Sequence, residues 1–142
     1  MVRTGKGGPG RGCARRGGGR AKPRGRAAGL GRVGEEAAAR YLVEVGYRVI
    51  ERNYRCRAGE IDLIALDGEV LCFIEVKARR TGAYGGGLEA VEGRKRARLR
   101  RAASWYLGRF GDRLPPCRCD VAEVWLDPEG RPERVTLVRN AF

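Results

Sequence analysis

Hydrophobic and polar residues alternate through two neighbouring segments near the middle of the chain, residues 59–66 and 69–78. Such alternation predicts β-strands, and the Asp67-Gly68 pair between them predicts a tight two-residue turn, so we expect a β-hairpin over residues 59–78. A turn centred on these two residues would place Glu60 opposite Glu75 and Asp62 opposite Phe73.

The two faces of this hairpin differ in charge. One face is wholly apolar and is expected to be buried; it carries Ile61, Leu63, Ala65, Val70, Cys72, Ile74 and Val76. The other face is apolar near the turn but charged at the open end, where Glu60, Asp62, Glu75 and Lys77 project from the same side. Carboxylates gathered in this way offer the oxygen ligands that a hard divalent cation prefers.

A helical pattern precedes the hairpin. Residues 35–45 contain three consecutive alanines and few β-branched residues, and Gly46 ends the pattern. Glu35 falls on the inward stripe, where a carboxylate is costly without a counter-charge, so we expect a cation or a lysine close to it. Glu36 falls on another side, where it is solvated and can pair with Arg40.

A second helix is predicted over residues 88–107, ended by Gly108. Its apolar stripe also contains Lys95, which either binds phosphate or extends out of the stripe to water. Six cations crowd into eight residues of this helix and would repel one another, so a phosphate backbone is a fitting partner; an ordinary solvated surface is the alternative. These cations are Arg94, Lys95, Arg96, Arg98, Arg100 and Arg101.

The remaining pattern predicts three more strands, over residues 47–52, 119–126 and 134–138, the first of them a candidate edge strand. The glycine-rich segment 81–87 lacks a Gly-Lys-Ser/Thr ending, so a phosphate-binding P-loop is not supported. The order of elements favours one α/β domain over residues 30–142, with a central mixed β-sheet flanked by helices.

Composition adds a strong positive charge. The chain of 142 residues carries a net charge of +13, and residues 1–29 are rich in glycine, lysine and arginine without any acid. We interpret this segment as a disordered basic tail that strengthens contact with a polyanion; a solubility tail or a mis-assigned start site is the alternative. No apolar run is long enough to span a membrane and no secretory signal is recognisable, so a cytoplasmic protein is expected.

The chain contains no histidine, which excludes histidine-based nucleophile pairs, histidine general bases and zinc sites with histidine ligands. Its five cysteines are irregularly spaced, and Cys117-x-Cys119 is a single pair, so reduced thiols are favoured over disulfides or zinc.

The charged end of the hairpin suits phosphodiester hydrolysis. Asp62 and Glu75 can share one Mg²⁺ or Mn²⁺ ion, with the backbone carbonyl of Val76 as a third oxygen ligand. Lys77 can orient or deprotonate the attacking water and stabilise the developing charge. Glu35 can add a further ligand, directly or through water.

Asp62 followed by Glu75-x-Lys77 resembles the PD-(D/E)XK motif of the restriction-endonuclease-like superfamily. The nearer likeness is to the YraN-like family of small bacterial predicted endonucleases, over about residues 30 to 126. The residues that carry it are Gly31, Gly34, Glu35, Leu42, Gly46, Asn53, residues 59–64 and 73–77, Arg79, Lys95, Asp120 and Val121.

The chain is also similar to archaeal Holliday junction resolvases, which combine a helix glutamate with the same set. The resemblance implies a restriction-endonuclease-like core, with Glu35, Asp62 and Glu75 as metal ligands and Lys77 as the catalytic lysine. It favours DNA, including branched DNA, over RNA, and the junction-cutting relatives imply a homodimer. Cys119 departs from the family, which usually has an aromatic residue there.

Several residues keep two interpretations. Glu60, Glu75, Lys77 and Arg79 could instead form ordinary surface ion pairs, which stabilise a protein little. Asp120 either caps a turn or, with Glu60, supports the site from behind, and Arg79 joins the cations expected to bind nucleic acid. For the whole protein the alternative is a module that binds nucleic acid without cutting it.

Overall fold

The computed structural model describes residues 26–82 and 88–142, with side chains described from 29 to 82 and from 93 onwards. The predicted basic tail up to residue 25, and residues 83–87 of the glycine-rich segment, lie outside the described residues.

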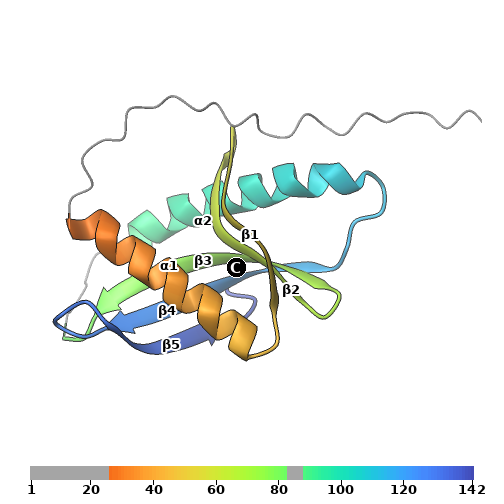
Figure 1. Ribbon diagram of the computed structural model, residues 1–142. Coiled ribbons are helices and arrows are strands. Elements are labelled where there is room, and N and C mark those ends of the chain that lie inside the picture. Colours follow the sequence, from red (N-terminus) through yellow and green to blue (C-terminus); the bar gives the residue numbers. More distant parts are fainter. Residues whose placement is uncertain (1–25, 83–87) are drawn as a thin grey trace, which may run out of the picture.

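The described chain forms one mixed sheet and two long helices (Figure 1). Strands β1 to β5 lie in sequence order across the sheet; β3 and β4 run parallel, and the other neighbours are antiparallel. This confirms the expected α/β fold, compatible with a restriction-endonuclease-like core, and β1 is indeed an edge strand. The elements are α1 (Arg26–Glu44), β1 (Arg48–Cys56), β2 (Gly59–Asp67), β3 (Val70–Arg80), α2 (Leu88–Leu107), the 3₁₀ turn η1 (Gly108–Phe110), β4 (Cys117–Leu126) and β5 (Pro132–Val138).

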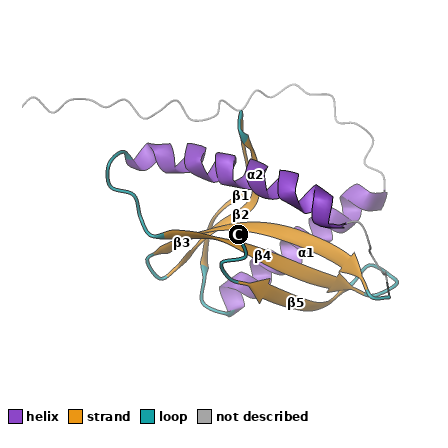
Figure 2. Cartoon of the chain, turned by 180° about the vertical axis from the view of Figure 1, so that it is seen from behind, coloured by secondary structure: helices purple, strands orange, loops and turns teal. Residues whose placement is uncertain are grey.

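The two helices cover opposite faces of the sheet, as Figures 1 and 2 show from front and back. Helix α1 packs through Ala38 and Leu42 onto the face that the hairpin pattern predicted to be buried, with Leu63, Cys72 and Ile74. Helix α2 covers the other face; its contact residues there are Leu99, Ala102, Ala103 and Tyr106, packed with Ile64, Leu71 and Phe73. The central strands β2, β3 and β4 are therefore covered on both faces.

The predicted register of the β2–β3 hairpin is wrong by two residues. The turn is Gly68-Glu69, so Phe73 pairs with Ile64 and not with Asp62, and the expected Glu60–Glu75 pair does not form. Gly68 has a φ of +60°, which suits the first central position of a type II′ turn, whereas Asp67 stays in the strand. Because side chains alternate with a period of two, this slip leaves each residue on its predicted face.

Ile61 is the exception to the predicted faces. Pairing between β2 and β3 ends at Leu63–Ile74, while β2 stays paired with β1 as far as Gly59. Beyond Leu63 the β1–β2 hairpin leaves the sheet and passes α2 (Figure 1), and Ile61 joins the core on the α2 side. The alternation of a flat hairpin therefore breaks at Asp62.

Helix α1 begins at Arg26, inside the segment that the sequence analysis assigned to the tail. The three glycines in the first part of the helix do not prevent it from forming. Glu36 pairs with Arg52 of β1 at 2.8 Å and not with Arg40, since β1 runs alongside the helix. Within the described residues, no helix is long and apolar enough to cross a membrane.

A buried ion-pair network joins the strands at the turn end of the sheet. Arg118 donates to both carboxylate oxygens of Asp120 at 3.0 Å, to Asp67 at 2.8 Å and to the Tyr47 hydroxyl at 2.7 Å. Asp120 is fully buried and also accepts the backbone N–H of Asn140, in a turn just before the C-terminus. These contacts support the turn-capping interpretation of Asp120 and explain why Asp67 is held in the strand.

Candidate functional site

An open cleft of about 760 Å³ lies where the β1–β2 hairpin leaves the sheet, and we call it the acidic cleft. It is bordered by α1, by α2, and by the strands between them. Three of the predicted ligands, Glu35, Asp62 and Glu75, line it together although they come from α1, β2 and β3. The cations that line it are Arg55, Arg57, Lys95, Arg98 and Arg101.

Asp62 is fixed at the point where β2 and β3 separate. Its Oδ2 atom accepts the backbone N–H of Val76 at 2.8 Å, beyond the last residue pair of the ladder. The pKa of Asp62 is raised to about 6: burial is the largest cause, the charges of Glu35, Glu75 and Glu60 add to it, and this hydrogen bond opposes it. The neighbouring glutamates therefore lie close enough to Asp62 to disfavour its charged form.

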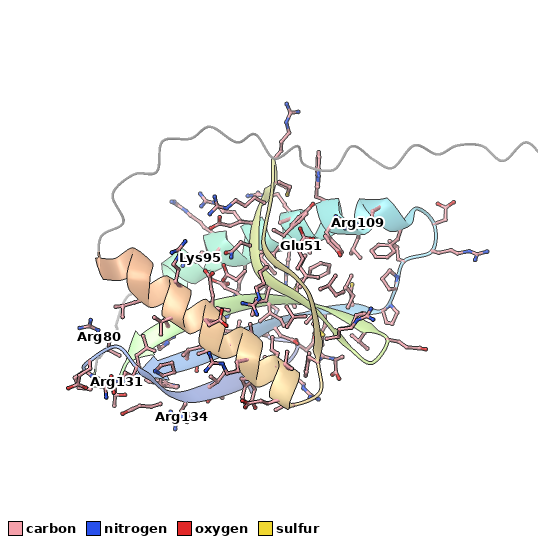
Figure 3. The ribbon with its side chains drawn as sticks, in the orientation of Figure 1. Glu51, Arg80, Lys95, Arg109, Arg131 and Arg134 are labelled. Atoms are coloured by element: carbon pink, nitrogen blue, oxygen red, sulfur yellow. The ribbon has the colours of Figure 1, made fainter. Side chains whose placement is uncertain are left out.

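Glu75 is buried on β3, with 8% of its surface exposed. The Lys95 ammonium of α2 lies 3.9 Å from its Oε1 atom, while the lysine stem remains largely exposed (Figure 3). Lys95 thus extends out of the apolar stripe of α2, which was one of the two interpretations drawn from the sequence. It places a positive charge at the edge of the acidic cleft. Because Lys95 is exposed and the two charges are 3.9 Å apart, this pair is not expected to contribute much to stability.

Glu35 reaches the acidic cleft because α1 lies very close to β3. A Cβ atom added to Gly34 would come within 2.9 Å of the Cβ atom of Ala78, so only glycine fits between helix and strand at that point. The neighbouring Glu36 points to Arg52 and is exposed. The predicted difference between the two glutamates is therefore confirmed.

The other predicted site residues of the hairpin differ in whether they line the acidic cleft. Val76 lines the acidic cleft, and Lys77, the next residue, is half-buried but is not among the lining residues. Glu60 lines the cleft and forms an exposed ion pair with Arg55 at 3.5 Å, while Arg79 pairs with Glu123 of β4 at 3.5 Å. The surface-pair interpretation therefore fits the contacts of Glu60 and Arg79.

The cations of α2 divide between two sides of the helix. Arg98 and Arg101 line the acidic cleft with Lys95, and Arg94 is exposed. Arg96 lies over the ring of Phe142 at 5.3 Å, on another side, and Arg100 lines a shallower crevice. Only part of the predicted basic surface thus adjoins the acids.

Arg55 and Arg57 were missed from the sequence. They flank the tip of the β1–β2 hairpin, and both line the acidic cleft opposite α2. The signal was present in the recurring arginines at positions 48, 52, 55 and 57. Because the predicted strand ended at residue 52, Arg55 and Arg57 were assigned to no element.

The donor set of the acidic cleft fits a hard divalent cation bound largely through water. Within residues 29–82 and 93–142, no three His, Cys, Asp or Glu side chains converge closely enough to hold a metal ion by themselves. Mg²⁺ does not need such a cage, because it keeps several waters and binds proteins through one or two carboxylates. Asp62 and Glu75, with Glu35 acting through water, would suffice.

The fold and the cleft define an α/β protein with a mixed five-stranded sheet and a carboxylate-lined depression at the point where two strands separate. Residues 34–124 match the model of the uncharacterised protein family UPF0102, and the chain belongs to this family.

Relatives from several bacteria match most of the chain. The UPF0102 protein of Symbiobacterium thermophilum is 56% identical over 113 residues, which is 80% of this chain and 95% of the relative. That of Moorella thermoacetica is 50% identical over 79% of this chain and 93% of its own length, and that of Frankia casuarinae is 48% identical over 80% and 95%. The similarity therefore includes every predicted ligand of the acidic cleft but not the whole basic N-terminal segment.

Proposed function

We propose that this protein is a metal-dependent endonuclease that hydrolyses phosphodiester bonds of DNA, branched or otherwise structured, in the acidic cleft. The observation that carries the proposal is that Glu35, Asp62 and Glu75, from three elements, line one cleft together with basic side chains. Carboxylates gathered in this way repel a bare phosphodiester unless a cation is bound among them, and the pKa of Asp62 is raised by its burial and by the neighbouring glutamates. The likeness to PD-(D/E)XK nucleases points to the same chemistry.

Each side chain has a distinct task in this proposal. Asp62 and Glu75 would hold Mg²⁺ or Mn²⁺, and the Val76 N–H keeps the Asp62 carboxylate turned towards the cleft. The bound ion would lower the pKa of a water and neutralise charge on the phosphate oxygens. Lys95, Arg98 and Arg101 would bind the phosphates that flank the cleaved bond.

Lys77 is proposed to hold the attacking water and to stabilise charge in the transition state. It follows Glu75 by two residues on β3, so strand alternation directs both side chains to the same face of the sheet. Because Lys77 does not line the acidic cleft, this role rests on the resemblance and on that alternation, and its variant is tested separately from those of the acids.

The direct test is a cleavage assay with the full-length protein on linear, nicked, flapped and four-way branched DNA, with Mn²⁺ or Mg²⁺ and with a chelator. We expect metal-dependent products from the wild type and none from Glu75→Gln, Asp62→Asn or Lys77→Ala. Glu69→Gln is the matched control for Glu75, because Glu69 is exposed in the turn at the far end of the same hairpin. Unchanged cleavage by the Glu75→Gln variant would remove the basis of the proposal.

A second candidate is a module that binds nucleic acid without cutting it. The exposure of the cations from Arg94 to Arg101 on α2 favours it. It predicts binding that weakens steeply with added salt, and that weakens again when Arg98 and Arg101 are replaced by alanine. Tight, salt-sensitive binding without products on any of the four substrates would select this candidate over the nuclease.

A further inference from the structure

The structure places one large aromatic side chain at the end of the basic surface beside the acidic cleft. Trp105 of α2 is 49% exposed, whereas Ala102 and Tyr106 beside it are buried in the core. Arg94, Arg98, Arg101 and Trp105 are separated by four, three and four residues, so they form one continuous stripe along α2.

The β1–β2 hairpin lies against this stripe. A Cβ atom added to Gly59 would lie 3.0 Å from the backbone oxygen of Arg98, so the hairpin tip touches the helix there. Ala58 of the tip lines a shallow crevice with Trp105, Arg100, Arg101 and Ser104. Arg101 borders both this crevice and the acidic cleft, so the two depressions adjoin.

A positively charged surface that ends in an exposed aromatic ring is the combination that binds single-stranded nucleic acid. The cations follow the phosphates, and an unpaired base stacks on the ring, whatever its sequence. In a duplex the base faces are covered by neighbouring bases, so an aromatic side chain beside the helix finds no free face to stack on. From Lys95 to Trp105 the helix rises about 15 Å, room for a few nucleotides of an extended strand.

We propose that Trp105 is a stacking platform for an unpaired base, and that the strand runs from the acidic cleft along the Arg98–Arg101 side of α2 to this ring. The inference rests on the proposed function, because it assumes that nucleic acid occupies the acidic cleft. It adds that the substrate has a single-stranded segment next to the cleaved bond. Single-stranded DNA and RNA share the chemistry that the ring recognises, and the test includes both.

The test compares the binding of a short oligothymidine, an oligouridine and a blunt duplex of the same length, with chelator present to prevent cleavage. For Trp105→Ala we expect a loss of affinity on the order of tenfold for both single strands, and a much smaller loss for the duplex. Trp105→Phe should retain most of the affinity because it keeps an aromatic face. Leu114→Ala is the matched control, since Leu114 is also exposed, at 61%, but lies after α2 and lines neither the acidic cleft nor the crevice beside Trp105.

Fluorescence gives a second measurement that does not depend on removing the ring. The chain contains two tryptophans, so Trp125→Phe leaves Trp105 as the only tryptophan. Trp125 itself lies on β4, beneath Arg134. Oligothymidine should quench this fluorescence strongly and the duplex weakly.

The outcomes separate this inference from the proposed function. If the wild type binds and cuts DNA but Trp105→Ala loses nothing on single strands, or loses equally on single strands and duplex, the stacking role is refuted and the nuclease stands. If the wild type binds no form of nucleic acid, both are refuted. If only oligothymidine is affected by Trp105→Ala, the platform belongs to a DNA-specific site.

Discussion

The Asp62 carboxylate accepts the backbone N–H of Val76 at 2.8 Å, at the point where β2 leaves β3. One contact therefore marks the end of the strand pairing and also orients a predicted metal ligand beside Glu75. The separation of the two strands opens the acidic cleft, so the candidate site is a consequence of the way the hairpin leaves the sheet.

The raised pKa of Asp62 predicts that the stability of the protein depends on pH. Its pKa is about 6 in the folded protein because of burial and of the nearby Glu35, Glu75 and Glu60, whereas an unfolded aspartate titrates near 3.9. The charged form is therefore disfavoured by folding, so stability contributed by this group is lost as the pH rises from about 4 to about 6 and stays lost above.

Asp62→Asn should consequently stabilise the metal-free protein. In urea unfolding with chelator, we expect a gain of roughly 3 kcal/mol at pH 8 that shrinks to well under 1 kcal/mol at pH 4. Glu69→Gln, in the exposed turn at the far end of the hairpin, serves as control. Added Mn²⁺ should reduce the difference in unfolding free energy between variant and wild type at pH 8, because it would bind the folded wild type. A gain of the same size at pH 4 and pH 8 would contradict the assignment.

The two adjacent glutamates of α1 offer a matched pair. Glu35→Gln should lower metal-dependent cleavage about 10- to 100-fold, the usual effect of removing a group that supports a metal ion from its outer shell. Glu36→Gln should leave the rate unchanged, since Glu36 is exposed and paired with Arg52. Single-turnover cleavage rates measure both, and equal effects of the two substitutions would remove Glu35 from the site.

Gly34 and Gly31 of α1 test the close contact that brings Glu35 to the cleft. Gly34→Ala places a methyl group 2.9 Å from the Cβ atom of Ala78, so we expect a loss of stability of about 1–3 kcal/mol. Gly31→Ala meets nothing within 4 Å and should gain about 0.5–1 kcal/mol from its better helix propensity. Chemical denaturation decides, and a gain for both would show that α1 does not need glycine at position 34.

The Arg118 network predicts a large effect on stability away from the acidic cleft. Arg118→Met leaves the fully buried Asp120 without its counter-ion, which should cost about 3–5 kcal/mol of unfolding free energy. Arg52→Met breaks the exposed pair with Glu36 and should cost no more than about 1 kcal/mol. Comparable losses in urea unfolding would mean that Asp120 is not stabilised mainly by Arg118.

Much of the fold could be predicted because its signals are local. The alternation of residues 59–78 assigned Leu63, Cys72 and Ile74 to one buried face and Phe73 to the other, and both assignments are confirmed. The register was missed because it depends on whether Gly68 takes the first or the second place in the turn. Asp67, which stays in the strand, accepts a hydrogen bond from Arg118, a residue distant in sequence whose contact no local pattern reveals.

The acids of the candidate site could be predicted from the sequence, but the basic residues of the β1–β2 hairpin beside them could not. Motif spacing brought Asp62 and Glu75 together, and helical periodicity turned Glu35 inward. Arg55 and Arg57 depend on the departure of the β1–β2 hairpin from the sheet, which begins at Asp62 and which periodicity does not reveal.

The most direct measurement is a crystal structure of the protein soaked in Mn²⁺, with an anomalous difference map collected near the manganese absorption edge. The account predicts an anomalous peak in contact with the carboxylates of Asp62 and Glu75, and its loss in crystals of Glu75→Gln. A map without a peak in the acidic cleft, at a concentration that loads manganese elsewhere on the protein, would contradict the account.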